Sequence, residues 1–196
     1  VTSKQYILNP AMLYPRDVTL DNYRLIFENP LIWSGYKNTL IVVACGVVYG
    51  MGMTVCMAYA FSRKSFPGKR PLFLLVLFTM FFGGGLIPLY LLIKNMGLIN
   101  ELGALILING VVPYYMIILK SGFEQIPESL EEAARIDGCT QAQAFRKIIL
   151  PLAAPAVFTT AILAFISSWN EYLISSQLSS DATQPVTVAI ASFAGS

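Results

Sequence analysis

Residues 131–151, EEAARIDGCTQAQAFRKIILP, bring acidic, basic and amide side chains together in a chain that is otherwise mostly apolar. These side chains suit ion pairs and helix caps. The chain has no histidine, which excludes a Ser-His-Asp triad, an HExxH zinc site and a histidine proton relay but does not exclude enzymes that work without histidine. Cys45, Cys56 and Cys139 show no metal-binding spacing, and we expect them to be small core residues. We expect no catalytic residue and no metal site.

Two helix-start signals follow one another in and just before this stretch. Ser129 with Glu132 fits an S-x-x-E capping box, and Thr140 with Gln143 fits a T-x-x-Q box. Gly138 lies between them, where a residue in the left-handed conformation would end the first helix. The sequence therefore predicts two short helices joined by a tight turn.

We call these two helices, residues 128–150, the charged module. Each helix is expected to have an apolar face and a charged face. The apolar faces are predicted to be formed by Leu130, Ala133 and Ala134 in the first helix and by Ala142, Phe145 and Ile149 in the second. An amphipathic helix pair can lie on lipid, pack on the spans of its own chain, or dock into another protein.

The composition indicates a membrane protein. The chain is 56% hydrophobic and only 12% charged, which is about half the charge of an average soluble domain. Its net charge of +2 is too small to suggest a nucleic-acid partner. Residues 39–61 carry no charge, and as a helix they would rise roughly 34 Å, enough to cross a bilayer core of about 30 Å. We predict a membrane span there.

Three further uncharged stretches are predicted to span the membrane, which makes four spans in all. Residues 71–93 contain three glycines at 83–85 and a proline at Pro88, so this span is expected to be broken or kinked. Residues 102–119 form a shorter span, and residues 152–170 form the fourth.

Lysine and arginine in the short loops predict the orientation, because cytoplasmic loops carry the excess of these residues. The loop between the first two spans holds Arg63, Lys64, Lys69 and Arg70; the segment before the fourth holds Lys120, Arg135, Arg146 and Lys147; the remaining loop holds only Lys94. Both rich segments are therefore expected in the cytoplasm, and residues 1–38 and 175–196 on the outer side. No signal peptide or upstream span precedes residues 1–38, so we expect that the chain lacks a preceding span or is a fragment.

The charged module resembles the EAA---G---------I-LP loop in the membrane subunits of bacterial ABC importers. The matching residues are Glu132, Ala133, Ala134, Gly138, Ile148, Leu150 and Pro151. The stretches SLEEAARIDG, ILP followed by Ala154 and Pro155, and SWNEYL near residue 170 resemble the sugar-importer branch related to the maltose permeases. FTMFFGGGLIP is similar to a subgroup associated with oligosaccharides and polysaccharide fragments. The resemblance covers essentially the whole chain.

This resemblance implies an all-α fold, a polytopic helical membrane protein with the type I ABC importer permease fold. Members usually have six spans, of which four are expected here, without the first and the last. Residues 1–38 would be an extracytoplasmic segment, residues 39–174 the transmembrane permease core, and residues 175–196 an extracytoplasmic segment before the missing last span. The implied location is the bacterial cytoplasmic (inner) membrane, which the chain would cross several times.

The resemblance also implies a function, that of the translocation subunit of an ATP-driven sugar importer, which itself hydrolyses nothing. The implied partners are a cytoplasmic ABC ATPase dimer, a second permease subunit, an extracytoplasmic solute-binding protein and membrane lipid. ATP and Mg²⁺ would be bound by the ATPase, and no cofactor by this chain. The sequence agrees independently, because its nearest phosphate-loop candidate, FPGKRP, lacks both the first glycine and the Ser/Thr.

The resemblance assigns ATPase coupling to one group of residues. They are Glu132, Ala133, Ala134, Asp137, Gly138, Ile148, Leu150 and Pro151. Glu132 would supply a docking charge, although a purely local role in its capping box is the alternative. The turn at Gly138 would set the angle between the docking helices.

A second group of residues is a candidate for the solute path or for contact with the solute-binding protein. This group is Trp169, Asn170, Glu171 and Gly84. For Glu171 the alternative is a solvated residue at the membrane interface, with Trp169 as an aromatic anchor. For the glycines at 83–85 we favour close packing of neighbouring spans over a broken span beside a solute path. The aromatic side chains expected to pack, and not to bind sugar, are Tyr114, Tyr115, Phe158 and Phe165.

Two other functions compete with import driven by ATP. A secondary carrier of small solutes would ordinarily need charged or strongly polar residues near the middle of its spans, and the four predicted spans have none there. An intramembrane enzyme without histidine and without paired aspartates in its spans has no visible catalytic constellation.

Overall fold

The computed structural model describes Arg24 and residues 27–195, and within them every regular element is a helix. The longest helix is α3 (Pro30–Ser62), whose first turn is capped by the Asn29 side chain accepting a hydrogen bond from Leu31 N. Proline in the first turn suits this start, because its missing N–H is not needed there. The helix confirms the first predicted span and extends it in the N-terminal direction, since it begins at Pro30 and not at residue 39.

Shorter helices follow α3 along the chain. They are α4 (Lys69–Phe81), α5 (Leu86–Asn95), α6 (Leu102–Ile108), α7 (Pro113–Glu124), α8 (Glu128–Ile136), α9 (Gln141–Ala144), a π-helical segment (Phe145–Ile149), α10 (Leu150–Leu152), α11 (Ala154–Trp169), α12 (Leu173–Leu178) and α13 (Val186–Gly195).

In the described residues, α3 alone is long and apolar enough to cross a membrane as one straight helix. Three consecutive helix pairs reach that length only together, and each is bent: α4 with α5 by 109°, α6 with α7 by 48°, and the run of residues 141–152 with α11 by 75°. Counting each pair as one span gives up to four spans. The break expected in the second span is confirmed between Phe81 and Leu86.

The glycines at this break were expected to allow close packing of neighbouring spans, and the described residues do not show such packing. Close packing should place side chains of other spans against Gly83, Gly84 and Gly85. Within the described chain, a Cβ built at Gly83 or Gly85 meets nothing within 4 Å, and one at Gly84 meets only Pro88. Gly85 has φ +84°, a conformation that glycine adopts without strain. Gly85 therefore suits the sharp bend, and the described part of the chain does not confirm the packing interpretation.

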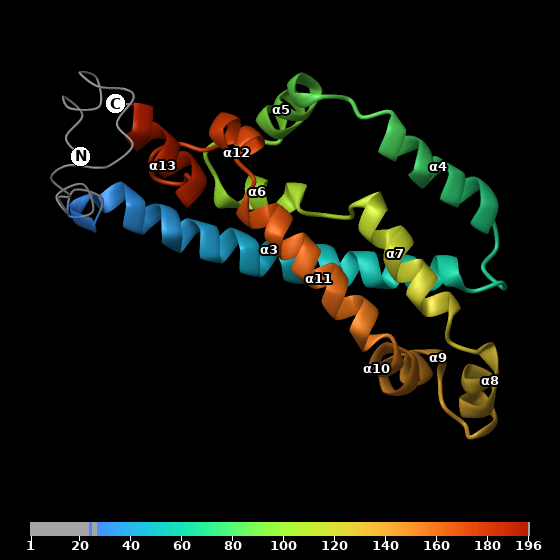
Figure 1. Cartoon of the computed structure of the whole chain (residues 1–196). Coiled ribbons are helices and arrows are strands. Elements are labelled where there is room, and N and C mark those ends of the chain that lie inside the picture. The colour runs from blue at the N-terminus through green and yellow to red at the C-terminus, as the bar shows by residue number, and fades with distance from the viewer. Residues whose placement is uncertain (1–23, 25–26, 196) are drawn as a thin grey trace, which may run out of the picture.

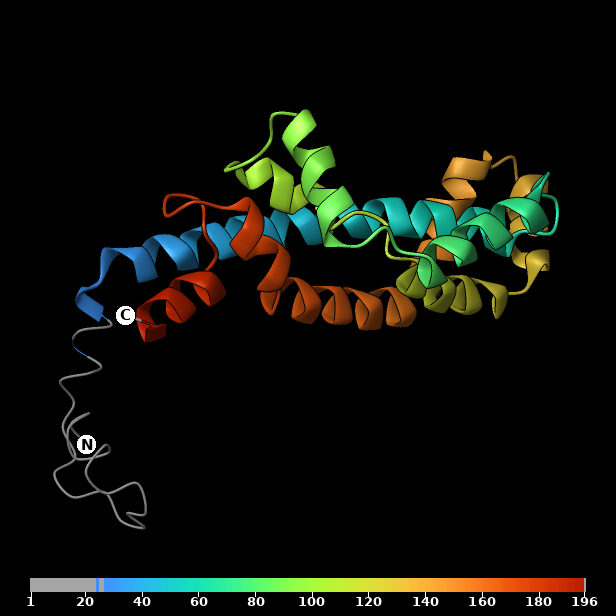
Figure 2. The same ribbon diagram turned by 90° about the horizontal axis from the view of Figure 1, so that it is seen from above.

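The helix α3 is the centre of the molecule, and α6, α7, α11 and α13 all pack against it. Figure 1 shows α3 running the full length of the bundle, with α13 beside its first turns and α8 near its last, and Figure 2 shows α6 and α11 on opposite sides of it. One buried apolar cluster lies around the C-terminal half of α3 and includes Phe61, Leu119, Phe123 and Ile149. A second, around Val42, Leu105 and Leu178, lies towards its start.

The break between α6 and α7 is held directly against α3. A Cβ on Gly50 would overlap the carbonyl oxygen of Asn109, and one on Gly46 would lie 3.0 Å from the Asn109 Cβ. The Asn109 Nδ2 donates to Leu105 O at 2.8 Å, which satisfies a carbonyl at the end of α6. Irregular backbone at membrane depth is tolerated where protein buries it, and the two glycines of α3 provide the necessary space.

Several residues expected in the core lie instead on the apolar outer surface. Cys45 and Cys56 are exposed on α3, and Cys139 is half-buried. Tyr114, Phe158 and Phe165 are exposed as well, whereas Tyr115 is half-buried and donates to Leu163 O at 3.2 Å. The core position expected of Cys45 and Cys56 is therefore wrong in the described chain, whereas Phe165 stacks on Trp169 at 5.7 Å and Tyr114 lies 5.9 Å from Tyr115. Apolar character does not distinguish the core from the lipid-facing surface of a membrane protein, because both are apolar.

Candidate functional site

The first helix of the charged module, α8, begins at Glu128 without a side-chain cap. Its N-cap residue is Pro127, with φ −58° and ψ 133°, so Ser129 and Glu132 are already inside the helix. The predicted Ser129–Glu132 capping box is therefore wrong. The helix ends as predicted, at Gly138 with φ +82°, where Gly138 N donates to Arg135 O at 3.0 Å and Cys139 N to Ala134 O at 2.9 Å.

The second half of the charged module is a continuous run of turns that leads into α11. Its capping box is confirmed: Gln143 N donates to Thr140 Oγ1 at 3.3 Å, and Thr140 N donates to Gln143 Oε1 at 2.8 Å. The turns pass through α9, the π-helical segment and α10 before the bend of 75° at Ala153. Of the motif residues here, Ile148 and Leu150 are half-buried and Pro151 is exposed in the first turn of α10.

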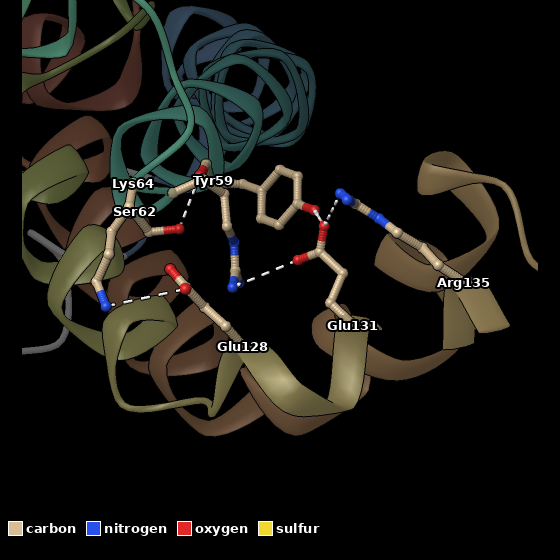
Figure 3. Close-up of polar contacts among 7 residues, drawn as sticks. Tyr59, Ser62, Lys64, Glu128, Glu131 and Arg135 are labelled. Atoms are coloured by element: carbon tan, nitrogen blue, oxygen red, sulfur yellow. Dashed lines mark hydrogen bonds and ion pairs between the residues drawn. The ribbon is translucent and has the colours of Figure 1, made fainter. Parts of the chain in front are cut away.

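The buried charge of α8 is Glu131, a residue that the sequence pattern did not identify. Its side chain is 5% exposed. Glu131 Oε1 accepts hydrogen bonds from the Tyr59 hydroxyl at 3.1 Å and from Arg135 Nη2 at 3.0 Å, as Figure 3 shows. Its other oxygen, Oε2, lies 3.4 Å from Arg63 Nη1. One carboxylate of the module is thus joined to two residues at the C-terminal end of α3.

Arg63 is the C-cap residue that directly follows α3, and it too is buried, with 7% of its surface exposed. Its guanidinium carbon lies 4.8 Å from the centre of the Tyr59 ring, which is cation–π geometry. Within the described residues its Nε and Nη2 atoms are buried without a hydrogen-bond partner. The guanidinium is therefore held by Glu131 and by the Tyr59 ring.

Tyr59 connects the second half of the charged module to the same turn of α3. Its ring centroid lies 4.5 Å from that of Phe145 in the π-helical segment and 5.8 Å from that of Phe123 in α7. Tyr59 and Arg63 are four residues apart, so they lie on one face of α3. Both halves of the module therefore contact one turn of α3, through Glu131 and through Phe145.

The opposite face of α8 is exposed. Glu132, Ala133 and Asp137 lie on it, together with Ile136, whose side chain is 86% exposed. This exposure corrects the predicted apolar face: Leu130, Ala133 and Ala142 are exposed, whereas Ala134 and Ala144 are buried. Phe145 and Ile149 face the core as predicted. The module thus has an anchored face and a free face.

The second group of candidate residues is only partly brought together. Glu171 Oε1 accepts a hydrogen bond from Ile174 N at 2.7 Å, which caps the start of α12. Trp169 stacks on Phe165 at 5.7 Å, and the exposed Asn170 donates to Ile166 O at 2.8 Å. Gly84 is not among their neighbours, because only Pro88 lies near it in the described chain.

A narrow cavity next to Glu171 is lined by further polar residues, which the sequence did not indicate as candidates. It is lined in part by Thr39 of α3, Asn109 of the α6–α7 break and Ser168 of α11. The Ser168 hydroxyl is buried and has no partner among the described residues. The break in the third predicted span and the end of the fourth therefore meet at one polar position inside the bundle.

Comparison with known proteins gives consistent matches. At 40% identity over 173 residues, covering 88% of this chain, it is similar to the polygalacturonan/rhamnogalacturonan transport system permease protein YtcP of Bacillus subtilis (strain 168). It is 41% identical over 189 residues to the trehalose transport system permease protein SugB of Mycobacterium tuberculosis, with 94% of this chain covered. These matches span 59% and 69% of the two proteins' lengths.

A solved structure agrees with the sequence matches. One chain in the crystal structure of a bacterial ABC transporter involved in the import of the acidic polysaccharide alginate superposes with a TM-score of 0.85 at 32% identity. The match covers 92% of this chain and 65% of that one. The fold is therefore that of an ABC importer permease.

The sequence of residues 52–194, which contains the whole charged module and the spans on either side of it, matches the model of one family of transport proteins. On this evidence the chain belongs to the family of binding-protein-dependent transport system inner membrane components.

Proposed function

We propose that this chain is the translocation subunit of an ATP-driven sugar importer, and that the charged module docks on a separate cytoplasmic ATPase. The observation that carries the proposal is the division of α8 into two faces. Glu131 fastens one face to the end of α3, while Glu132, Ala133 and Ile136 are exposed on the other. A helix arranged in this way can transmit force from a partner to a membrane span.

The chemistry of the exposed face supports a protein partner. Ile136 lies on a helix that also carries exposed acidic residues at Glu132 and Asp137, so this face suits contact with protein more than burial in lipid. Burial of such an apolar side chain in a partner's groove would be worth about 1.5–3 kcal/mol. The expected groove on the ATPase is apolar at its centre, with basic side chains at its rim.

The solute is proposed to be a sugar, an oligosaccharide or a polysaccharide fragment. The names of the similar proteins refer to trehalose, polygalacturonan and alginate. Sugars are recognised by hydrogen bonds and by stacking on aromatic rings. Asn109, Ser168 and Glu171 supply polar groups inside the bundle, and Trp169 lies two residues from Glu171. Trp169, Asn170 and Glu171 remain our candidates for contact with the solute or with its binding protein.

The remaining partners follow from the same proposal. ATP and Mg²⁺ would be bound by the ATPase dimer, and this chain would bind no cofactor and perform no hydrolysis. A second permease subunit would complete the path, and an extracytoplasmic solute-binding protein would deliver the solute. The helix α4 packs Phe73 and Val76 against the core, while its exposed Leu74, Leu75 and Phe78 are free to contact lipid or the second permease.

The orientation proposed places the charged module in the cytoplasm of a bacterium, with the chain crossing the inner membrane. Arg63 and Lys64 pair with Glu131 and Glu128 of α8, and Lys69 pairs with Glu124 at the end of α7. Arg135 lies in α8, and Arg146 and Lys147 lie in the π-helical segment that packs against it. This asymmetry is that of cytoplasmic loops.

The test is to purify the permease from cells that also express the ATPase, the second permease and the solute-binding protein. The ATPase should co-purify, and the exchange Glu132→Lys should reduce its yield. Glu101→Lys, an equally exposed site before α6, should leave the yield unchanged and serves as the control. Sugar uptake that needs no ATPase and collapses with the proton gradient would overturn the proposal in favour of a secondary carrier.

A further inference from the structure

We propose that the buried pair of Arg63 and Glu131 is the joint through which movement of α8 reaches α3. This inference rests on the proposed function, because it requires that a partner moves α8. Arg63 and Glu131 would be positioning residues: neither touches solute or nucleotide, and both fix the angle between the charged module and the longest span.

The contacts of α8 support this assignment. Among the described residues, the hydrogen bonds and ion pairs from α8 to the end of α3 and the two residues that follow it come from Glu128 and Glu131. The pair of Glu128 with Lys64 is exposed and 3.8 Å long, so it is weak and screened by salt. Glu131 instead holds Tyr59, Arg63 and Arg135 at once, with its side chain almost fully buried. The rigid connection is therefore the one at Glu131.

Burying this ion pair costs desolvation free energy, which indicates that the pair positions α8 relative to α3 more than it stabilises the fold. A buried ion pair can often be replaced by apolar residues without loss of stability. Here Arg63 even leaves Nε and Nη2 without partners in the described part of the chain. Glu131 Oε2 likewise accepts no hydrogen bond in the described chain, so its contact with Arg63 at 3.4 Å is an ion pair alone. What the pair provides is position, since the guanidinium lies over the Tyr59 ring on one side and faces a single carboxylate oxygen on the other.

The position of the pair explains how both halves of the charged module can move α3 together. The Tyr59 ring that supports Arg63 also packs against Phe145, which precedes the bend into α11. A displacement of α8 by a partner would therefore be transmitted to α3 through Glu131. The second half of the module contacts α3 at the same turn, so both halves would act on α3 together. Without the joint, α8 could tilt on its own, and ATP would be hydrolysed without equal movement of the spans.

The test uses the complete importer in proteoliposomes, with Cys45, Cys56 and Cys139 replaced by serine. Cysteines are introduced by Arg63→Cys and Glu131→Cys and are bridged by a short bifunctional methanethiosulfonate reagent that a reductant removes. The measured quantity is the amount of sugar taken up per ATP hydrolysed. In the double variant without the bridge, we expect this ratio to fall at least about fivefold, a change that corresponds to a typical allosteric coupling energy. The ratio should recover when the bridge is formed.

The matched control introduces cysteines by Lys64→Cys and Glu128→Cys, next to the first pair. Its uptake ratio should not change, with or without the bridge. A second variant, Glu131→Gln, removes the charge but keeps the volume of the side chain and one acceptor oxygen for Tyr59 and Arg135, so it should disturb the fold less than Glu131→Ala does. It should assemble with the ATPase in normal yield and still show a reduced uptake ratio.

Each outcome separates the joint from the proposed function. If the double cysteine variant without its bridge and the Glu131→Gln variant both assemble and couple normally, Arg63 and Glu131 are not the joint. The proposed function as an importer subunit would still stand. If the bridged variant is inactive, the pair must open during transport, and the proposed rigid joint is wrong. If the ATPase fails to co-purify even with the unsubstituted permease, the proposed function itself is overturned.

Discussion

Glu131 and Glu132 are consecutive residues of α8, and one is buried against α3 while the other is exposed. Glu131 is 5% exposed, accepts hydrogen bonds from Tyr59 and Arg135 and forms an ion pair with Arg63, whereas Glu132 is exposed. Successive side chains on a helix point about 100° apart, so two adjacent glutamates can serve two different surfaces. One anchors the helix to its own chain, and the other is available to a partner.

These two glutamates should respond differently to the same substitution. Glu131→Ala leaves Arg63 buried without its partner, so we expect a loss of about 3–5 kcal/mol in the free energy of unfolding. Glu132→Ala should change stability by less than about 0.5 kcal/mol and reduce only the binding of the ATPase. Thermal unfolding in detergent and co-purification of the ATPase measure the two effects. Equal unfolding temperatures for the two variants would contradict the assigned burial.

The turn at Gly138 should tolerate asparagine better than valine. Gly138 has φ +82°, and a Cβ there would meet no described atom within 4 Å, so any cost is conformational and not steric. Valine in this region should cost about 1–2 kcal/mol, and asparagine less. We expect Gly138→Val to insert normally and to lower sugar-stimulated ATPase activity. Normal coupling in Gly138→Val would show that the angle set by this turn is not used.

The close approach of α3 to the α6–α7 break can be tested with two glycines of one helix. Gly50→Ala would drive a methyl group into the Asn109 carbonyl, whereas Gly52→Ala adds a methyl group that meets nothing within 4 Å in the described chain. The first should destabilise the protein by about 1–3 kcal/mol, as overpacked sites do, and the second should not. Both are measured by thermal unfolding in the same detergent. A stable Gly50→Ala variant would mean that the break does not rest on α3.

The orientation should be visible by cysteine labelling in a background without native cysteines. Cysteines at Ser65 and Gln141, both exposed, should react with an impermeant reagent only from the cytoplasmic side. A cysteine at Asp181, exposed near α12, should react only from outside. Labelling of position 141 from outside would reverse the topology, and with it the docking of the charged module.

The parts of this structure that could be predicted are those determined by local sequence. Gly138 and the Thr140–Gln143 capping box were correct because a turn and a cap depend on a few neighbouring residues. The Ser129–Glu132 box was wrong because Pro127, with its fixed φ, places the start of α8 before Ser129. The break at residues 83–85 was also predicted, but its packing role was not confirmed.

The parts that could not be predicted depend on contacts between distant residues. Arg63 was noted only as a loop charge and Glu131 not at all, because their pairing exists only once α8 folds back onto α3. Glu131 and Ala134 are three residues apart and therefore lie on one face of a helix, and both are buried. This spacing was the feature of the sequence that could have identified Glu131. Cys45 and Cys56 were expected in the core but are exposed, because an apolar residue in a membrane span can face either core or lipid.

The most direct measurement of the central claim, that the exposed face of α8 docks on the ATPase, is site-specific photo-cross-linking in the assembled importer. A photoreactive amino acid at Ile136, on the exposed face, should form an adduct with the ATPase, and its yield should change when ATP binds. The same group at Asp181 should form none. An active importer without an ATPase adduct from position 136, or with an equal adduct from position 181, would contradict the claim.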